Sequence, residues 1–527
     1  MMSGQKKRAC LCIVAVLLVC ATAVRCQLNF KDTVAELAAN GKLPNATQTV
    51  AGYTAQTLCS GVFVSQRSFN SVWDNDACMF NCLAHTIFNR TDPQHSYGRF
   101  AVNNASKYVN ASVLDSSTSA IFAGDRFGCQ LSLVNQTQVV PKYADNGRRA
   151  APNVWKDATM NSSNAISGVD YAKLNATLAR YFENATLVEK AKTQAIVVIH
   201  KGQLIAEMYS AAMDIKPSTP LVSWSLAKSV TSAVVGVRTA DTDMDLDFSQ
   251  FQLATTPVWN ASEIAARNIT VDDLMRMVSG IDWNEGARNL NSKKGVPVSA
   301  VGEMLYEAQD AAAFVGALPQ NATPGQYYNY STGNYQVVQY NLRKSFKGND
   351  MHYWSYAYNK IFKKIGATSF SFEPDPSGTL LGGSSAYMTP RDWARFGQLY
   401  LQGGKWNDEQ ILPQGWVEYS TTPTNAFSGY GAGWWLQFPG APAGTFYGNG
   451  LLGQRVIVVP AMDMVIARMG LNFLDDFDQV YGRDFFTGIA ACIPANAAPQ
   501  GKVVAAKGLS QTVDFALGDS LAATVQT

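Results

Sequence analysis

The chain has 527 residues, of which 47% are hydrophobic and 16% charged, so it can bury a large core and its length favours more than one structural unit. Its 42 basic and 40 acidic residues are interspersed and leave a net charge of +2, which excludes the basic stripe typical of nucleic-acid binding. The four histidines have no ligand spacing with one another or with a cysteine, so we expect no metal and no cofactor.

Residues 1–26 have the layout of a secretory signal. Basic residues at 6–8 precede the apolar run ACLCIVAVLLVCATAV, and cleavage after Ala23 or Cys26 would fit. The alternative, an uncleaved anchor, is disfavoured because the run is about 15 residues long and a bilayer span needs roughly 20. We therefore expect a secreted protein, or one in the lumen of the secretory pathway or a lysosome-like compartment, with no stable membrane span after cleavage.

Twelve N-glycosylation sequons support export, since roughly four would be expected by chance. Most of these sequons precede residue 190. This predicts that much of that part of the chain lies at the protein surface, exposed to a glycosylating lumen. The sequon at Asn329 overlaps a candidate active site described below, and we expect it to carry no glycan. The sites that we expect to be modified are Asn45, Asn89, Asn104, Asn110, Asn135, Asn161, Asn175 and Asn184; Asn260, Asn268 and Asn321 are further sequons.

Three of the nine cysteines lie in the apolar run and leave with the signal. In an oxidising lumen most of the others should pair. Our hypothesis pairs Cys59 with Cys129 and Cys78 with Cys82, while the state of Cys26 and Cys492 stays open.

Residues 27–165 form a polar, glycosylatable accessory region. SGVFVS at 60–65 and the stretch 97–134 alternate apolar and polar residues between Gly, Asn and Asp clusters. This alternation predicts short strands and hairpins, and therefore a small β-rich unit.

A different pattern begins near residue 166. The stretch 170–191 has helical periodicity, and 193–210 reads as a buried strand, a Lys-Gly turn and a second strand. Residues 452–470 repeat the strand-turn-strand arrangement, so two hairpins distant in sequence can join one antiparallel sheet with helices around it. We assign residues 166–495 to this α/β (α+β) unit and 496–527 to a C-terminal tail.

The segment LVSWSLAKSVTSAVVGV, residues 221–237, places Ser225 three residues before Lys228 in the first turn of an apolar helix. This spacing puts the hydroxyl and the amine on one helix face. A serine nucleophile needs a base, and a lysine can serve when burial and the helix N-terminus lower its pKa. Ser3 and Lys6 have the same spacing, and an N-capping serine beside a surface lysine is the alternative interpretation.

The segment TPGQYYNYSTGNYQVVQY, residues 323–340, contains a Tyr-x-Asn at Tyr327 and a Tyr-Ser-Thr at Tyr330. With the serine and lysine segment before it, the chain resembles the serine β-lactamase and penicillin-recognising superfamily, particularly the class C-like branch with its esterases and 6-aminohexanoate-dimer hydrolases. The branch pattern fits Pro324, Gly325, Tyr328, Tyr330 and Ser331. The resemblance extends over about 190–470 and favours Tyr330 over Tyr327.

The resemblance implies an antiparallel sheet flanked by helices, with an all-helical subdomain. It also implies that Ser225 is the nucleophile, that Lys228 and Tyr330 move its proton, and that the N–H groups of Ser225 and Leu451 form the oxyanion hole. Gly448 stands where relatives have a basic or aromatic residue that helps to hold a substrate carboxylate, which disfavours a true β-lactamase. The expected substrate-binding residues are Leu451, Asn449, Gly450, Gln454, Thr332 and Trp434.

Class A β-lactamases activate water with a glutamate motif, but the nearest equivalent here, Glu285 with Asn289, precedes Tyr330 at the wrong spacing. We therefore expect Lys228 and Tyr330 to serve both steps of an acyl-enzyme mechanism.

The sequence predicts a secreted serine hydrolase that cleaves an amide or ester bond of a small molecule or short peptide. The alternatives are a D-Ala-D-Ala carboxypeptidase or β-lactamase, and a catalytically silent secreted binding protein. The oligomeric state stays open.

Overall fold

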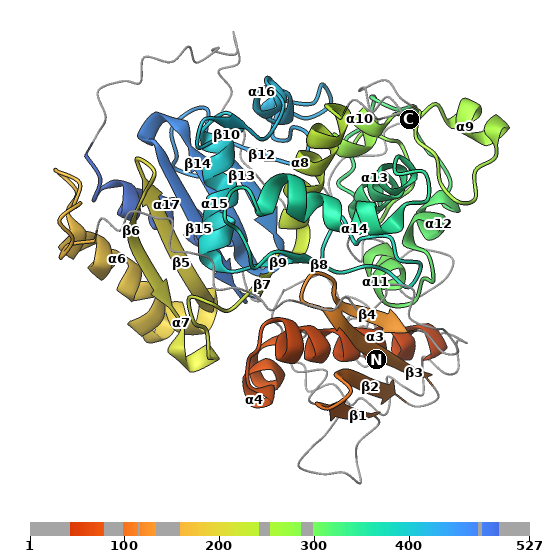
Figure 1. Ribbon diagram of the computed structural model, residues 1–527, viewed down its shortest axis with the longest axis horizontal. Helices are drawn as coiled ribbons and strands as arrows, with labels where there is room; N and C mark the ends of the chain where they lie inside the picture. The colour runs from red at the N-terminus through yellow and green to blue at the C-terminus, as the bar shows by residue number, and fades with distance from the viewer. Residues whose placement is uncertain are drawn as a thin grey trace, which may run out of the picture.

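The computed structural model describes residues 43–77, 98–113, 116–132, 159–241, 253–285, 299–472 and 477–494. Within these ranges, a small N-terminal unit packs against a larger unit of mixed helix and sheet (Figure 1). The larger unit combines an antiparallel sheet with a cluster of helices beside it, as the sequence predicts.

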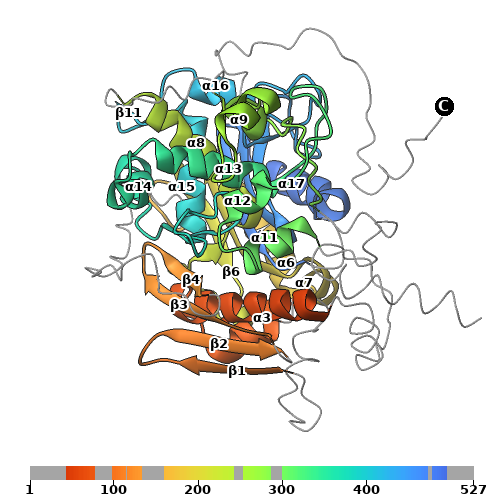
Figure 2. The same ribbon diagram turned by 90° about the vertical axis from the view of Figure 1, so that its right-hand side faces the viewer.

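The N-terminal unit consists of helix α3 (Leu43–Cys59) on a four-stranded antiparallel meander. Alternate residues of the second strand, Val109, Ala111 and Val113, are buried, as the period-2 pattern predicts. Helix α3 and the last strand face the larger unit, and the first strand lies farthest from it (Figure 2). The strands are β1 (Gly98–Asn103), β2 (Tyr108–Val113), β3 (Ser116–Gly124) and β4 (Gly128–Ser132).

A disulfide joins Cys59 at the end of α3 to Cys129 in β4, which confirms that predicted pair. The predicted Cys78–Cys82 bridge lies outside the described residues. Cys492 is a buried free thiol.

The prediction of a strand at 60–65 is wrong, because Ser60–Val64 is a π-helical turn that continues α3. Ser60, Gly61 and Val64 are its buried residues, a helical spacing that six residues of sequence do not distinguish from alternation. A Cβ atom on Gly61 would lie 2.4 Å from Val72 Cγ1, so the glycine lets the turn pack closely on α4 (Phe69–Val72). A second π-helical turn, Trp73–Ala77, follows α4.

The larger unit is built on a six-stranded antiparallel sheet of order β12-β13-β14-β15-β5-β6. The two predicted hairpins are adjacent, because β15 pairs with β5. The strands are β5 (Thr193–His200), β6 (Gln203–Tyr209), β12 (Trp435–Leu436), β13 (Phe446–Gly450), β14 (Gln454–Val459) and β15 (Met464–Gly470).

Both faces of this sheet are covered, which explains why every residue of β5 is buried. Ala195, Val197 and Ile199 belong to the core shared with helix α15 (Pro390–Leu401), which lies along β14 and β15 in Figure 1. Ile196 and Val198 belong to the opposite core. Helices α6 (Tyr171–Glu183) and α17 (Arg483–Ala490) cover that face.

Helices α9 to α14 gather on one side of the sheet, where Figure 1 shows them in shades of green, whereas α7 packs against α6. The remaining helices are α7 (Ala185–Ala191), α8 (Ala227–Thr239), α9 (Ala261–Arg267), α10 (Val271–Met275), α11 (Ala300–Tyr306), α12 (Ala311–Gly316), α13 (Thr332–Lys344), α14 (Asp350–Ala357) and α16 (Trp416–Thr421). Small sheets are formed by β7 (Leu221–Val222), β9 (Ala386–Met388) and β8 (Ser371–Phe372), and by β10 (Lys405–Trp406) with β11 (Glu409–Gln410). Among the described helices, none combines the length and the apolar composition needed to cross a bilayer.

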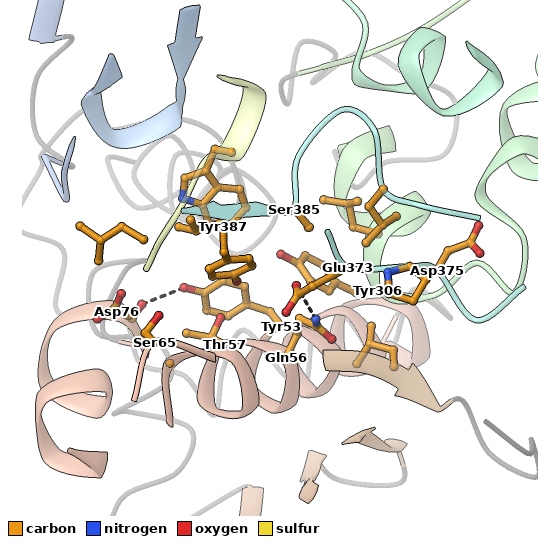
Figure 3. A pocket seen from close by; sticks show the side chains of 18 of the residues that line it. Tyr53, Gln56, Thr57, Ser65, Asp76, Tyr306, Glu373, Asp375, Ser385 and Tyr387 are labelled. Atoms are coloured by element: carbon orange, nitrogen blue, oxygen red, sulfur yellow. Dashed lines mark hydrogen bonds between the residues drawn. The ribbon is translucent and has the colours of Figure 1, made fainter. Parts of the chain in front are cut away.

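A cavity of about 60 Å³ lies between the two units, with Tyr53 and Gln56 of α3 on one side and Glu373 and Tyr387 on the other (Figure 3). The Glu373 carboxylate accepts hydrogen bonds from Ser60 Oγ at 2.5 Å, Gln56 Nε2 at 2.7 Å and Cys129 N at 3.0 Å. Burial raises the pKa of Glu373 to about 7, although these hydrogen bonds act in the opposite direction. The contact between the units is therefore most favourable when Glu373 is neutral.

We predict that Glu373→Gln stabilises the protein at neutral pH. A carboxyl whose pKa is raised in the folded state, here from 4.5 to about 7, loses its stabilising contribution as the pH rises through that range. The free energy of unfolding of the variant, relative to the wild type, should rise between pH 5 and pH 8 by roughly 3 kcal/mol at most. Chemical denaturation at both pH values measures it, with the exposed Glu189→Gln as control. An equal difference at both pH values would contradict the assignment.

Candidate active site

Ser225 lies in a single 3-10 turn, Trp224–Leu226, immediately before α8 rather than within the first turn of the helix. The preceding residue, Trp224, has a left-handed φ of 44°, a strained conformation for a bulky side chain. The backbone of Ser223 holds the turn in place, because its N–H donates to Ala386 O at 2.8 Å. The turn is therefore held between α8 and the small sheet formed by β7, β8 and β9.

Lys228, the second residue of α8, is 1% exposed and directs its amine at Ser225. Its Nζ atom donates to Ser225 Oγ at 2.9 Å, to Thr332 Oγ1 at 2.9 Å and to Gly383 O at 3.0 Å. The structure thus brings the predicted pair into contact, whereas Ser3 and Lys6 lie outside the described residues.

Burial lowers the pKa of Lys228 from 10.5 to about 8, and the negative charge of Glu285 acts in the opposite direction. A substantial share of the amine is therefore neutral near physiological pH. A neutral amine at hydrogen-bonding distance from a serine hydroxyl has the properties of a general base.

Tyr330 completes the predicted trio. Its ring centroid lies 4.8 Å from Lys228 Nζ, and its hydroxyl is close enough to Ser225 for that side chain to lower its pKa in part. Burial and the charge of Glu285 raise the pKa of Tyr330 well above its usual value, so the phenol stays protonated. Tyr327, the competing tyrosine, is 60% exposed.

Strand β13, which carries Gly448, Asn449 and Gly450, packs directly on the turn that contains Ser225. A Cβ atom on Gly448 would lie 2.1 Å from Leu226 Cδ1, and one on Gly450 would lie 2.1 Å from Ser223 O. The two glycines let the strand approach the turn, which gives a steric reason for the missing basic residue at 448. Leu451 follows at the exposed end of the strand.

Trp434 and Gln454, both expected to bind substrate, lie in the protein interior away from Ser225. Trp434 is fully buried, with its ring 4.4 Å from that of Tyr400, while the half-buried Trp435 lies 5.5 Å from Tyr330. Gln454 is also buried, and its amide donates to Leu451 O at 3.0 Å and to Gly470 O at 2.6 Å. We therefore replace Trp434 by Trp435 and regard Gln454 as a brace for the segment at 451.

An aromatic wall extends from Trp435 beside the trio. Tyr430 lies 5.3 Å from Trp435, and Phe427 lies 4.6 Å from Tyr328, measured between ring centroids. Three of these four rings, those of Tyr328, Phe427 and Trp435, are half-buried. This surface suits an uncharged apolar group.

Glu285 precedes Tyr330 at a spacing unlike that of the class A glutamate motif, but it contacts the site through Thr332. Its carboxylate accepts hydrogen bonds from Thr332 Oγ1 at 2.5 Å, from Thr332 N at 2.7 Å and from Trp283 Nε1 at 2.5 Å. The contact joins residues 47 positions apart, so no local sequence pattern reveals it.

A family model described as Beta-lactamase matches residues 184–472, more than half of the chain. The chain belongs to the beta-lactamase family. The match covers the turn with Ser225, the helix with Lys228, the segment with Tyr330 and strand β13, and it assigns the chain to a hydrolase family with this fold.

Relatives in this family include the 6-aminohexanoate-dimer hydrolase of Paenarthrobacter ureafaciens, 23% identical over 352 residues, which cover 62% of this chain and 87% of that protein. Among solved structures, a Bacillus anthracis protein provisionally assigned as a 6-aminohexanoate-dimer hydrolase is 21% identical with a TM-score of 0.44, over 58% of this chain and 80% of that one. FmtA from Staphylococcus aureus is 15% identical with a TM-score of 0.42, over 63% and 91%.

The two adjacent tryptophans should differ in their effects. Trp434→Ala leaves a cavity in the core and should cost about 3–5 kcal/mol of stability. Trp435→Ala removes part of the aromatic wall and, for the hydrolase activity proposed below, should lower turnover of an ester about tenfold, since losing about 1.4 kcal/mol of contact has that effect on rate. Thermal melts and hydrolysis of a p-nitrophenyl ester separate the two. A large activity loss confined to folded Trp434→Ala would reverse the assignment.

Proposed function

We propose that this protein is a serine hydrolase that cleaves an amide or ester bond through an acyl-enzyme on Ser225. The observation that carries the proposal is the buried Lys228 amine, 2.9 Å from Ser225 Oγ, with its pKa lowered to about 8. An inert member of the fold has no need for a buried amine of this kind, which burial destabilises in its charged form.

In the acylation step, Ser225 Oγ attacks the substrate carbonyl carbon while its proton passes to Lys228 Nζ. The N–H groups of Ser225 and Leu451 are the proposed donors to the oxyanion. The tetrahedral intermediate then collapses, and the leaving amine or alcohol takes a proton from Lys228 through the Tyr330 hydroxyl. Tyr330 serves as a proton relay rather than as a phenolate base, because its pKa is raised.

In the deacylation step, a water molecule gives its proton to the Lys228 and Tyr330 pair and attacks the ester carbon. The acid product leaves, and Ser225 Oγ regains its proton. One base thus serves both steps.

The aromatic wall and Gly448 favour a neutral, linear acyl group as substrate. The relative from Paenarthrobacter ureafaciens is a hydrolase of 6-aminohexanoate dimer, which makes linear amides a sensible part of a substrate screen. A β-lactam, whose carboxylate needs a cationic partner, fits the position at 448 less well. Turnover of a chromogenic cephalosporin would favour that second reading.

We also propose that the protein is secreted or resides in a lumenal compartment. The disulfide between Cys59 and Cys129 suits an oxidising environment. The sequon asparagines Asn104, Asn110, Asn161, Asn175 and Asn184 are exposed. Asn329 differs, because its side-chain amide donates to Trp283 O at 3.0 Å and is engaged within the protein.

A fluorophosphonate probe tests the proposal without knowledge of the substrate. We expect peptide mass spectrometry to find the probe on Ser225 alone and to find none on Ser225→Ala. Tyr330→Phe should slow labelling or ester turnover at least tenfold, whereas Tyr327→Phe, at the exposed neighbouring tyrosine, should not. Absence of labelling in folded, disulfide-bonded protein would favour the silent binding protein.

Ester hydrolysis should depend on pH through Lys228. Since the neutral amine is the active form, kcat/KM should rise with pH and level off above an apparent pKa of about 8. Lys228→Met should abolish activity, and Lys190→Met, at an exposed lysine, should leave the profile unchanged. A profile that keeps rising toward pH 10 would show that Lys228 is not the titrating base.

A further inference from the structure

A continuous chain of hydrogen bonds connects Ser225, Lys228, Thr332 and Glu285, with distances of 2.9, 2.9 and 2.5 Å. We propose that Glu285 is a positioning residue that fixes the direction of this chain and thereby aims the lone pair of the neutral Lys228 amine at Ser225. The inference rests on the proposed serine hydrolase function and adds a residue to it.

The direction of the chain follows from which atoms can donate. The N–H groups of Thr332 and Trp283 can only donate, and both point at Glu285 Oε2. A carboxylate can only accept, so the single proton of the Thr332 hydroxyl is donated to Glu285 Oε1. The Thr332 oxygen is then available only as an acceptor for Lys228.

A neutral amine has two protons and one lone pair, and the three neighbours of Lys228 Nζ divide them. Gly383 O is a carbonyl and can only accept, and Thr332 Oγ1 accepts because its own proton is held by Glu285. The two protons of the neutral amine are thereby assigned, so at the 2.9 Å contact where the charged amine donates to Ser225 Oγ, the lone pair of the neutral amine faces the serine hydroxyl. Ser225 is the one neighbour of the three with a proton to give, which is the geometry that a general base requires.

Glu285 acts on Lys228 through charge as well as through direction. Its negative charge raises the pKa of Lys228 and opposes the effect of burial. Removing the charge should therefore increase the neutral fraction of the amine while misdirecting its lone pair. These opposite effects distinguish a positioning role from simple damage to the site.

Glu285→Gln tests the proposal with nearly identical shape. The glutamine carbonyl must face the two N–H donors, so its NH₂ group meets Thr332 Oγ1 and donates to it. The hydroxyl proton of Thr332 then turns toward Lys228, which occupies the lone pair. We expect about a 100-fold loss both in kcat/KM for an ester and in the rate of fluorophosphonate labelling. The apparent pKa of the residual activity should move to lower pH.

Asp282→Asn is the matched control, since Asp282 is an exposed acid three residues before Glu285. It should retain wild-type rates and the wild-type pH profile. A Glu285→Gln variant within threefold of the wild type would overturn the proposal, as would a pH profile that does not move.

A double-mutant cycle with Thr332 separates positioning from a loss of folding. Thr332→Val removes the hydroxyl but keeps the backbone N–H that donates to Glu285, while Thr332→Ser restores the hydroxyl and should restore most of the rate. In the Thr332→Val background, Glu285→Gln should cost less than threefold further. Fully additive losses would mean that Glu285 acts by another route, and the proposal would fail.

The two proposals fail in different ways. If the wild type is not labelled at Ser225, the serine hydrolase function itself is wrong. If the wild type is labelled and Glu285→Gln is labelled at the same rate, only the role of Glu285 is wrong.

Discussion

The burial of the Lys228 amine is the constraint on which the rest of the site depends. An ammonium group removed from water is costly unless all its protons are accepted, and the fold supplies three acceptors from separate segments. These are Ser225 in the turn before α8, Thr332 at the start of α13 and the carbonyl of Gly383. The same burial lowers the pKa of Lys228 to about 8. The burial that requires three hydrogen-bond acceptors therefore also makes the amine a usable base.

Each of the three acceptors is held by its own packing. The turn with Ser225 is fastened to the small sheet through Ser223, and its other side is covered by the glycines of β13. Helix α13 begins at a fixed point because the Ser331 hydroxyl accepts the N–H of Asn334 at 3.0 Å. A Cβ atom on Gly383 would lie 2.8 Å from Thr332 O, so that loop also depends on a close backbone approach. The site is therefore rigid because three unrelated segments meet there.

The N-terminal unit packs against the larger unit, while Ser225, Lys228 and Tyr330 all belong to the larger unit. The cavity between the two units is lined by Trp224, the residue immediately before Ser225, and by Ser385. Ser385 precedes Ala386, whose carbonyl accepts the hydrogen bond from Ser223 N. Gln56 of α3 and the backbone N–H of Cys129 in β4 donate hydrogen bonds to Glu373. These bonds connect the N-terminal unit to the segment that leads to Ala386. The N-terminal unit thus contacts the segment that holds the turn with Ser225 in place.

Sequence patterns predicted the features that depend on residues close together in the chain. The contact between Ser225 and Lys228, the period-2 strands of the N-terminal sheet and the two hairpins all appear in the structure, although Ser225 lies in the turn before the helix. The adjacent Trp434 and Trp435 could not be told apart, because Trp435 begins β12 and the pairing of β12 with β13 decides which of the two side chains faces inward. Glu285 was set aside because of its spacing, since its contact with Thr332, 47 positions along the chain, forms only when the two segments pack together.

The most direct test of the account is the titration of Lys228 itself. Lysines labelled with ¹³C at the ε-methylene position can be followed by NMR across the pH range, and the Lys228 signal can be assigned from its absence in Lys228→Met. We expect the Lys228 signal to titrate near pH 8, well below the usual 10.5. If the Lys228 signal titrates with the exposed lysines, the amine is not available as a base at neutral pH, and the proposed mechanism is wrong.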